Sequence, residues 1–213
     1  MDAERTQLSF RIFGTPGAER LVVLVGAGDT STVDPSAVVT AAREIRILAV
    51  ALTGAAIDDP GTFGSQTPAE QTATALADLV REQLGVDGSD EDPRTAGILA
   101  YRAAGDVALR ATKELGEVVD RLALVAVPLP EGPLDRDDLG GLIQGITANT
   151  LIMNGRRDGE AGDDAASWYR DHIASARVEI VPQDDPLSLT DVWERILSHV
   201  APGTKRSPSS DAS

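Results

Sequence analysis

The chain has 213 residues, with 34 acidic against 19 basic side chains, a net charge of −15 and no cysteine. This length suits one α/β domain with a full core, and the negative charge disfavours nucleic acids and anionic membrane surfaces as partners. The lack of cysteine excludes thiol nucleophiles, disulfides and thiolate metal sites, and no apolar run is long enough to cross a bilayer.

Short apolar runs alternate with helical patterns along the chain. Alternating apolar and polar residues over 8–13 predict a half-buried strand near a sheet edge, whereas continuous apolar runs predict strands covered on both faces. The expected strands occupy 8–13, 21–25, 45–52, 98–101, 122–127, 150–154 and 178–181. The expected helices occupy 35–43, 67–84, a segment that begins just after 102, 134–146, 165–174 and 189–200.

The best local signal for a helix start lies at Thr67, which is followed by Pro68 and, three residues on, by Glu70. Thr67 is expected to be the N-cap of a capping box, with the proline at the first helical position. Strands alternating with helices predict a three-layer α/β sandwich with a mostly parallel central sheet. We expect one domain over 1–201 and a disordered tail over 202–213, because the tail is rich in Pro, Ser, Thr and Gly.

The apolar run 98–101 leads into a sharp turn of small residues and then into a helix. This is the shape of a nucleophile elbow, in which a buried strand passes directly into a helix and one side chain projects at the tip. The tip carries Arg102, between Tyr101 and Ala103. None of these three side chains is an ordinary elbow nucleophile.

Four segments, taken in order, resemble the α/β-hydrolase family. Residues 21–29 resemble its third strand and oxyanion turn, with Gly26, Ala27 and Gly28 in the turn. Residues 98–109 resemble the elbow strand and helix. Residues 150–158 resemble the strand and loop of the triad acid, which implies that role for Asp158. Residues 178–186 resemble the histidine loop, and the histidine position falls near Asp184 or Asp185.

The chain departs from that family at the residues that carry the chemistry. Arg102 stands at the nucleophile position, and the two histidines, His172 and His199, fall on predicted helices, where we expect them to be solvated. Nucleophilic catalysis needs an imidazole within hydrogen-bond reach of the hydroxyl. The resemblance therefore implies the hydrolase scaffold without its Ser-His-Asp chemistry. It also implies no lid domain, because the segment between Val127 and Thr150 is too short for the helical lid that often covers the family's pocket.

Three other sequence patterns are weaker candidates for a functional site. The Gly-x-Gly at 26–28 is interpreted as a tight turn rather than a dinucleotide fingerprint, since its third glycine is missing. The acidic run 87–92 lacks the spacing of a calcium loop and is interpreted as a solvated surface. Asp106 could be an aspartyl nucleophile, but a carboxylate in the first turn of a helix is the better interpretation. We expect no cofactor and no metal.

Three functions remain open. The first is a catalytically inactive protein that binds a small molecule or a protein at the former active-site mouth. The second is an enzyme with a non-standard site that uses Arg102 and Asp158 on a carboxylate-bearing substrate. The third is a structural, homodimeric interaction protein.

Three further expectations concern the elbow arginine, the location of the protein and the source of the chain. A partly buried Arg102 needs a carboxylate partner, for which Asp158, Asp184 and Asp185 are candidates, or a path into solvent past Tyr101. The N-terminus has no secretory signal pattern, so we expect a soluble, cytoplasmic protein. The abundance of Ala, Gly, Asp and Arg suggests a bacterium with a GC-rich genome.

Overall fold

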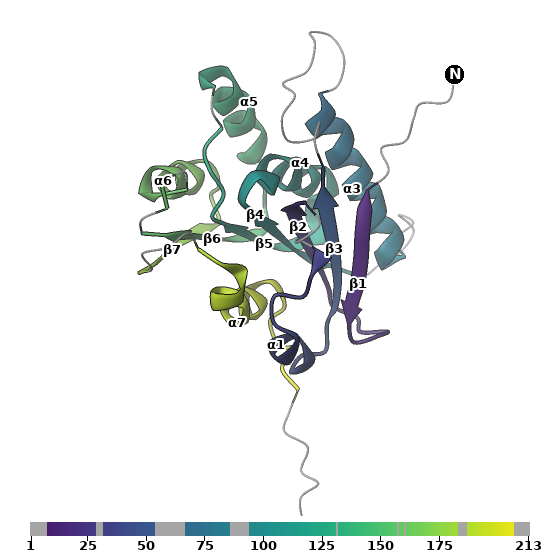
Figure 1. Ribbon diagram of the computed structural model, residues 1–213. Coiled ribbons are helices and arrows are strands. Elements are labelled where there is room, and N and C mark those ends of the chain that lie inside the picture. The colour runs from purple at the N-terminus through teal and green to yellow at the C-terminus, as the bar shows by residue number, and fades with distance from the viewer. Residues whose placement is uncertain are drawn as a thin grey trace, which may run out of the picture.

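The seven strands that the computed structural model describes form one sheet (Figure 1). The described residues are 8–28, 32–53, 67–85, 94–130, 132–156, 158–159, 161–182 and 187–206. The strands are β1 (Ser9–Gly14), β2 (Leu21–Ala27), β3 (Arg46–Leu52), β4 (Ala96–Tyr101), β5 (Val119–Val125), β6 (Asn149–Gly155) and β7 (Ala176–Val181).

The strand order is β1-β3-β2-β4-β5-β6-β7. β1 runs antiparallel to β3 at one edge, and every other neighbouring pair is parallel. β4 is the middle strand of the seven. The predicted fold class, the edge position of the first strand and the central position of the elbow strand are therefore confirmed.

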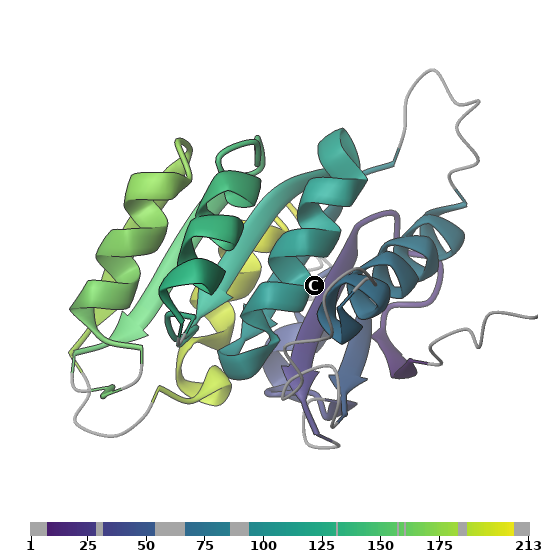
Figure 2. The ribbon, with the colours of Figure 1, turned by 90° about the horizontal axis from the view of Figure 1, so that it is seen from above.

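Helices cover both faces of the sheet (Figure 1). α3 to α6 lie over one face and α1 and α7 over the other, and Figure 2 shows α4, α5 and α6 side by side across the sheet. The helices are α1 (Ala37–Ala41), α3 (Pro68–Leu84), α4 (Gly105–Leu115), α5 (Pro133–Ile143), α6 (Asp163–His172) and α7 (Leu189–Val200).

One hydrophobic core lies on each face of the sheet. In β2, Leu21, Val23 and Val25 pack into the core beneath α3 to α6. The alternate residues Val22 and Leu24 pack into the core beneath α7. All five side chains are at most 1% exposed, and burying each contributes about 1.5–3 kcal/mol. Burial on both faces explains why this strand has a continuous apolar sequence.

The predicted capping box at the start of α3 is present. The Thr67 hydroxyl oxygen accepts from the Glu70 main-chain N–H at 3.2 Å, and Glu70 Oε2 accepts from the Thr67 N–H at 2.8 Å. These bonds satisfy two main-chain donors that the first turn of a helix leaves without partners. Gly85 ends the helix with a left-handed φ of 69°.

Several element boundaries differ from the sequence prediction by one to three residues. β5, for example, begins at Val119, three residues before the expected apolar run, and its second residue, Asp120, pairs with Arg20 at 2.8 Å. The segment expected to be a disordered tail is ordered over its first residues. Glu44 donates to the Thr204 carbonyl at 2.8 Å and Arg206 donates to the Ala42 carbonyl at 3.0 Å. Residues 207–213 lie outside the described part of the chain.

No helix in the described ranges is long and apolar enough to cross a membrane.

Candidate functional site

The elbow is present at the carboxyl end of the central strand. β4 ends at Tyr101, residues 102–104 form a 3-10 turn, and α4 begins at Gly105. Arg102 has a φ of 53°, in the left-handed region. Such a conformation is uncommon for a non-glycine residue and costs it about 1 kcal/mol or more. Arg102, the first residue of the turn between β4 and α4, therefore has a strained backbone conformation.

Small residues allow α4 to approach the sheet closely at this turn. Ala100 and Ala104 are fully buried. A Cβ atom added to Gly105 would overlap Val127 Cγ1, which leaves no room for a side chain there. The helix can follow the strand so abruptly because these positions carry at most a methyl group.

Tyr101 connects the elbow to the segment in front of α7. Its hydroxyl donates a hydrogen bond to the Leu187 carbonyl oxygen at 2.9 Å. Arg102 lies over the same tyrosine, with its Cζ 5.3 Å from the ring centroid. This distance is within the range of a cation–π interaction. The sequence offered no signal for the Leu187 contact, because the acceptor is a main-chain group.

The Gly26–Gly28 turn lies beside the elbow. β2 and β4 are neighbours in register, with Val25 opposite Ala100. Gly28 has a φ of 73° and donates its N–H to the Leu52 carbonyl at 2.9 Å. The structure therefore brings together the two segments expected to form the nucleophile and oxyanion sides of the site.

Asp158 follows β6 and is 7% exposed. Its Oδ1 accepts from the Ala161 N–H at 3.3 Å. Its Oδ2 is buried and has no hydrogen-bond partner among the described residues. β6 is separated from β4 by β5, so Asp158 shares the carboxyl edge of the sheet with the elbow without adjoining it in the ladder.

The predicted pairing of Arg102 with Asp158 is not formed: within the described ranges no ion pair joins them. The aromatic ring of Tyr101 provides the guanidinium with a contact in its place. Asp184 and Asp185, the other two candidate partners, lie outside the described residues. A pairing of Arg102 with either of them stays a prediction.

Neither histidine lies at the elbow. His199, on α7, has its Nε2 3.0 Å from both the Leu122 and the Asn149 carbonyl oxygens. Asn149 is the first residue of β6, so His199 lies toward the amino end of the sheet, opposite the elbow. His172 ends α6 and stacks on Trp168 at 4.3 Å between ring centroids.

The expectation that both histidines are solvated is wrong for His199, which is 5% exposed. The apolar face of α7 turns it toward the sheet, where two carbonyl groups surround its Nε2. Burial lowers the pKa of His199, and the positive charges of Arg177 and Arg121 add to that effect against the two main-chain hydrogen bonds.

A network of charged side chains is centred on Arg110 of α4, the helix that follows the elbow. Arg110 bonds to Asp106 at 2.9 Å, to Asp138 at 3.0 Å and to Glu70 at 3.5 Å, so it links α4 to α5 and α3. Burial raises the pKa of the Asp106 carboxyl, and the positive charge of Arg110 opposes this. Asp106 is therefore a carboxylate in the first turn of α4 that pairs with Arg110, which agrees with the interpretation preferred from the sequence.

The described residues hold no group of three or more His, Asp or Glu side chains arranged to bind a metal ion. The acidic run 87–92 lies outside them.

Comparison with known proteins finds similar structures but no matching sequence family. No protein-family model and no curated protein matches the chain. Among solved structures, it is similar to carboxylesterase CesB from Bacillus subtilis, with 14% identity and a TM-score of 0.68 over 95% of this chain and 90% of that one.

It is also similar to a monoacylglycerol lipase from Paleococcus ferrophilus, with 11% identity and a TM-score of 0.63 over 90% of this chain and 97% of that one. A hydrolase from Pseudomonas aeruginosa is 16% identical, with a TM-score of 0.61 over 90% and 92%. At such identities the likeness shows the fold alone, which is the α/β-hydrolase fold.

Proposed function

We propose that this chain is a hydrolase-fold protein without Ser-His-Asp catalysis that binds a ligand at the former active-site mouth. The observation that carries the proposal is Arg102 at the tip of the elbow, with its φ of 53°. A protonated guanidinium has no lone pair with which to attack a carbonyl carbon. The position that the fold reserves for a nucleophile therefore holds a cation.

The placement of the histidines supports the same proposal. A serine hydroxyl needs an imidazole within hydrogen-bond reach to remove its proton. His199 is engaged by carbonyl groups toward the amino end of the sheet, and His172 stacks on Trp168. With only two histidines in the sequence, no other imidazole can serve.

The charge at the elbow favours a carboxylate as the group that is bound. Arg102 is half-buried over the Tyr101 ring, and the main-chain N–H groups that begin α4 carry a partial positive charge. A guanidinium also matches a carboxylate in a two-pronged geometry. The proposed ligand is a small carboxylate-bearing molecule or a carboxylate of a protein partner.

A fluorophosphonate serine-hydrolase probe and an acyl-ester turnover assay test the absence of catalysis, with CesB as the positive control. We expect neither stoichiometric labelling nor turnover, both for the wild type and for Arg102→Ser, because the variant gains a hydroxyl but no base. Labelling of the wild type, or a large gain in turnover by Arg102→Ser, would contradict the proposal.

Binding is tested separately, by titrating acetate into ¹⁵N-labelled protein and following the amide signals around the elbow. Saturable shifts that disappear in Arg102→Gln support binding at the mouth. Shifts that persist in this variant place acetate elsewhere and count against it. The alternative enzyme with Asp158 as base predicts turnover of a carboxylate-bearing ester that both Arg102→Gln and Asp158→Asn abolish.

A second candidate function, homodimerisation, is favoured by the exposed edge of the sheet. Within the described residues β1 pairs only with β3, and Phe10 and Ile12 on it are 43% and 47% exposed. Both point to the same face, since side chains alternate along a strand. An unpaired strand edge with apolar side chains is a template for another strand.

The sequence of β1 suits an antiparallel pairing with a second copy. A two-fold axis at Phe10 sets this residue against its own copy and Leu8 against Ile12, while Arg11 meets Ser9 rather than another arginine. Such apolar pairs contribute about 0.2–1 kcal/mol each, and opposed like charges are avoided. A stable dimer needs further contacts to bury at least about 1,000 Å².

Sedimentation velocity over a concentration series tests this second function. We expect a dimer that Phe10→Lys dissociates and that Val38→Lys leaves intact, since Val38 is 83% exposed on α1 and is not part of the β1 edge. A wild type that is monomeric throughout, or a dimer indifferent to Phe10→Lys, contradicts it.

A further inference from the structure

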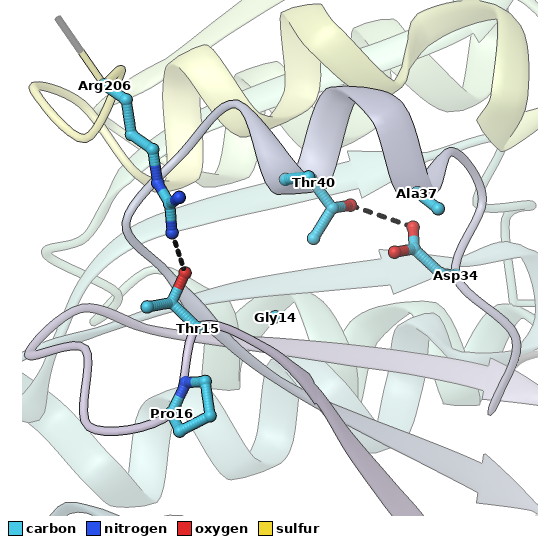
Figure 3. Close-up of a pocket in the computed structure, with 8 residues that line it drawn as sticks. Gly14, Thr15, Pro16, Asp34, Ala37, Thr40 and Arg206 are labelled. Atoms are coloured by element: carbon cyan, nitrogen blue, oxygen red, sulfur yellow. Dashed lines mark hydrogen bonds between the residues drawn. The ribbon is translucent and has the colours of Figure 1, made fainter. Parts of the chain in front are cut away.

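A pocket of about 310 Å³ lies at the other end of the sheet from the elbow. Gly14 lines it and pairs with Arg46, the first residue of β3, which sets that side of the pocket at the amino end of the parallel strands. Its walls come from three separate segments of the sequence: the turn after β1, the segment around α1, and Arg206, which follows α7 (Figure 3). The lining residues are Gly14, Thr15, Pro16, Asp34, Ala37, Thr40, Ala41 and Arg206.

One end of the pocket carries a positioned cation. Arg206 donates from Nη2 to the Thr15 hydroxyl at 2.8 Å, and its main-chain N–H donates to the Ala42 carbonyl. The preceding residue, Lys205, is held by Glu194 at 2.9 Å. Among the described residues no carboxylate pairs with Arg206, although the chain has 34 acidic side chains.

The opposite end carries a positioned anion. Asp34 Oδ1 accepts from the Thr40 hydroxyl at 2.8 Å and from the Ser36 N–H at 3.0 Å. Thr40 is itself fixed, because its hydroxyl oxygen accepts from Trp193 Nε1 at 3.0 Å. These bonds use one carboxylate oxygen and orient the group, and no basic side chain of the described residues pairs with it.

Figure 3 shows Arg206 and Asp34 at opposite sides of the pocket, each bonded to its own threonine. No ion pair joins them within the described ranges, so each charge is available to a ligand that enters between them. A simple anion would also face Asp34, and a simple cation would also face Arg206. A molecule that carries both charges satisfies both ends.

We propose that this pocket binds a small zwitterionic amino acid, with its carboxylate on Arg206 and its ammonium group on Asp34. Its volume is at the lower end of the range for small-molecule sites, which suits a ligand of this size. Gly14, Ala37 and Ala41 contribute little side-chain bulk to the walls and leave room for the ligand. The site is distinct from the elbow and does not depend on the function proposed there.

NMR titration of the ¹⁵N-labelled full chain tests the proposal. The probes are glycine, β-alanine and 4-aminobutyrate, which separate the two charges by increasing distances, with acetate and methylammonium as single-charge controls. We expect at least one amino acid to bind saturably, with shifts at Thr15 and over residues 37–41, and about tenfold more tightly than either control.

Two isosteric variants then assign the charges. Arg206→Gln and Asp34→Asn are each expected to weaken amino-acid binding about tenfold or more, since each removes a charge-assisted hydrogen bond. The amide oxygen introduced by Asp34→Asn still accepts from the Thr40 hydroxyl, which preserves the local structure. Arg170→Gln, which breaks an exposed pair with Asp171, is the matched control and leaves binding unchanged.

Three results overturn the proposal: no saturable binding of any of the amino acids, acetate binding as tightly as the best of them, or affinity unaffected by both pocket variants.

Discussion

Replacing Arg102 by glycine and by alanine measures the strain at the elbow. Both variants lose the contact of the guanidinium with Tyr101, which is worth about 0.5–1 kcal/mol at an exposed site. They differ in the backbone. Alanine keeps the cost of a left-handed φ, about 1–2 kcal/mol, whereas glycine escapes it and instead loses about 0.5–1 kcal/mol of chain entropy on folding.

The difference between the two variants therefore isolates the backbone. We expect Arg102→Gly to be more stable than Arg102→Ala by about 0.5–1 kcal/mol, or a few degrees at most in Tm for a chain of this size. Urea unfolding at equilibrium gives the free energies, provided that the slopes agree among the variants.

Ala103→Gly is the matched control, one residue along the same turn. Ala103 has no positive φ and its side chain is exposed. Glycine there brings only the entropic cost and should destabilise the protein by about 0.5–1 kcal/mol. If Arg102→Gly is no more stable than Arg102→Ala, the tip of the elbow does not hold the left-handed conformation, and the placement of Arg102 at the nucleophile position is refuted.

Three further predictions concern the packing and ionisation around this scaffold. Gly105→Ala should cost about 1–3 kcal/mol in urea unfolding because the new methyl group overlaps Val127, whereas Gly141→Ala, in open space on α5, should stabilise by about 0.5–1 kcal/mol; equal effects would contradict the close approach at the elbow. Burial lowers the pKa of His199 below its ordinary 6.5, so the unfolded chain takes up the proton first. The stability that His199 contributes is complete above its ordinary pKa of 6.5 and is lost as the pH falls through the folded-state pKa. The wild type should therefore lose more stability than His199→Gln between about pH 7.5 and about pH 5.5. Equal losses in the two proteins would show that the pKa of His199 is not lowered by folding. Tyr101→Phe leaves a carbonyl group without its donor and should cost about 1 kcal/mol, and thermal unfolding identical to the wild type would argue against that hydrogen bond.

Periodicity was sufficient to predict the sheet. Strands covered on both faces, such as β2 and β3, have uninterrupted apolar sequences, and the alternating sequence of β1 fits its position at the edge. The elbow was also predictable, because the turn needs small residues at fixed places around one projecting side chain. Only local geometry enters these inferences, which is why they agree with the structure.

The environment of His199 was within reach of the same argument. Val192, Ile196 and His199 recur at helical spacing, which places the histidine on the buried face of α7. The polar side chain of a histidine suggested exposure to solvent instead. The helical spacing, which indicates burial, agrees with the structure. No comparable signal exists for the pocket between Asp34 and Arg206, since only the tertiary fold brings the C-terminal segment against the chain before β3.

The elbow separates two demands that a catalytic hydrolase must meet together. The backbone needs small residues and a left-handed φ at the tip, whereas the chemistry needs a nucleophilic atom and a base. This chain meets the first demand through Ala104, Gly105 and the conformation of Arg102. Tyr101 then links the elbow to Leu187, in the segment that follows β7. That link is a neutral hydrogen bond to a main-chain carbonyl, so it holds the two segments together without activating any nucleophile.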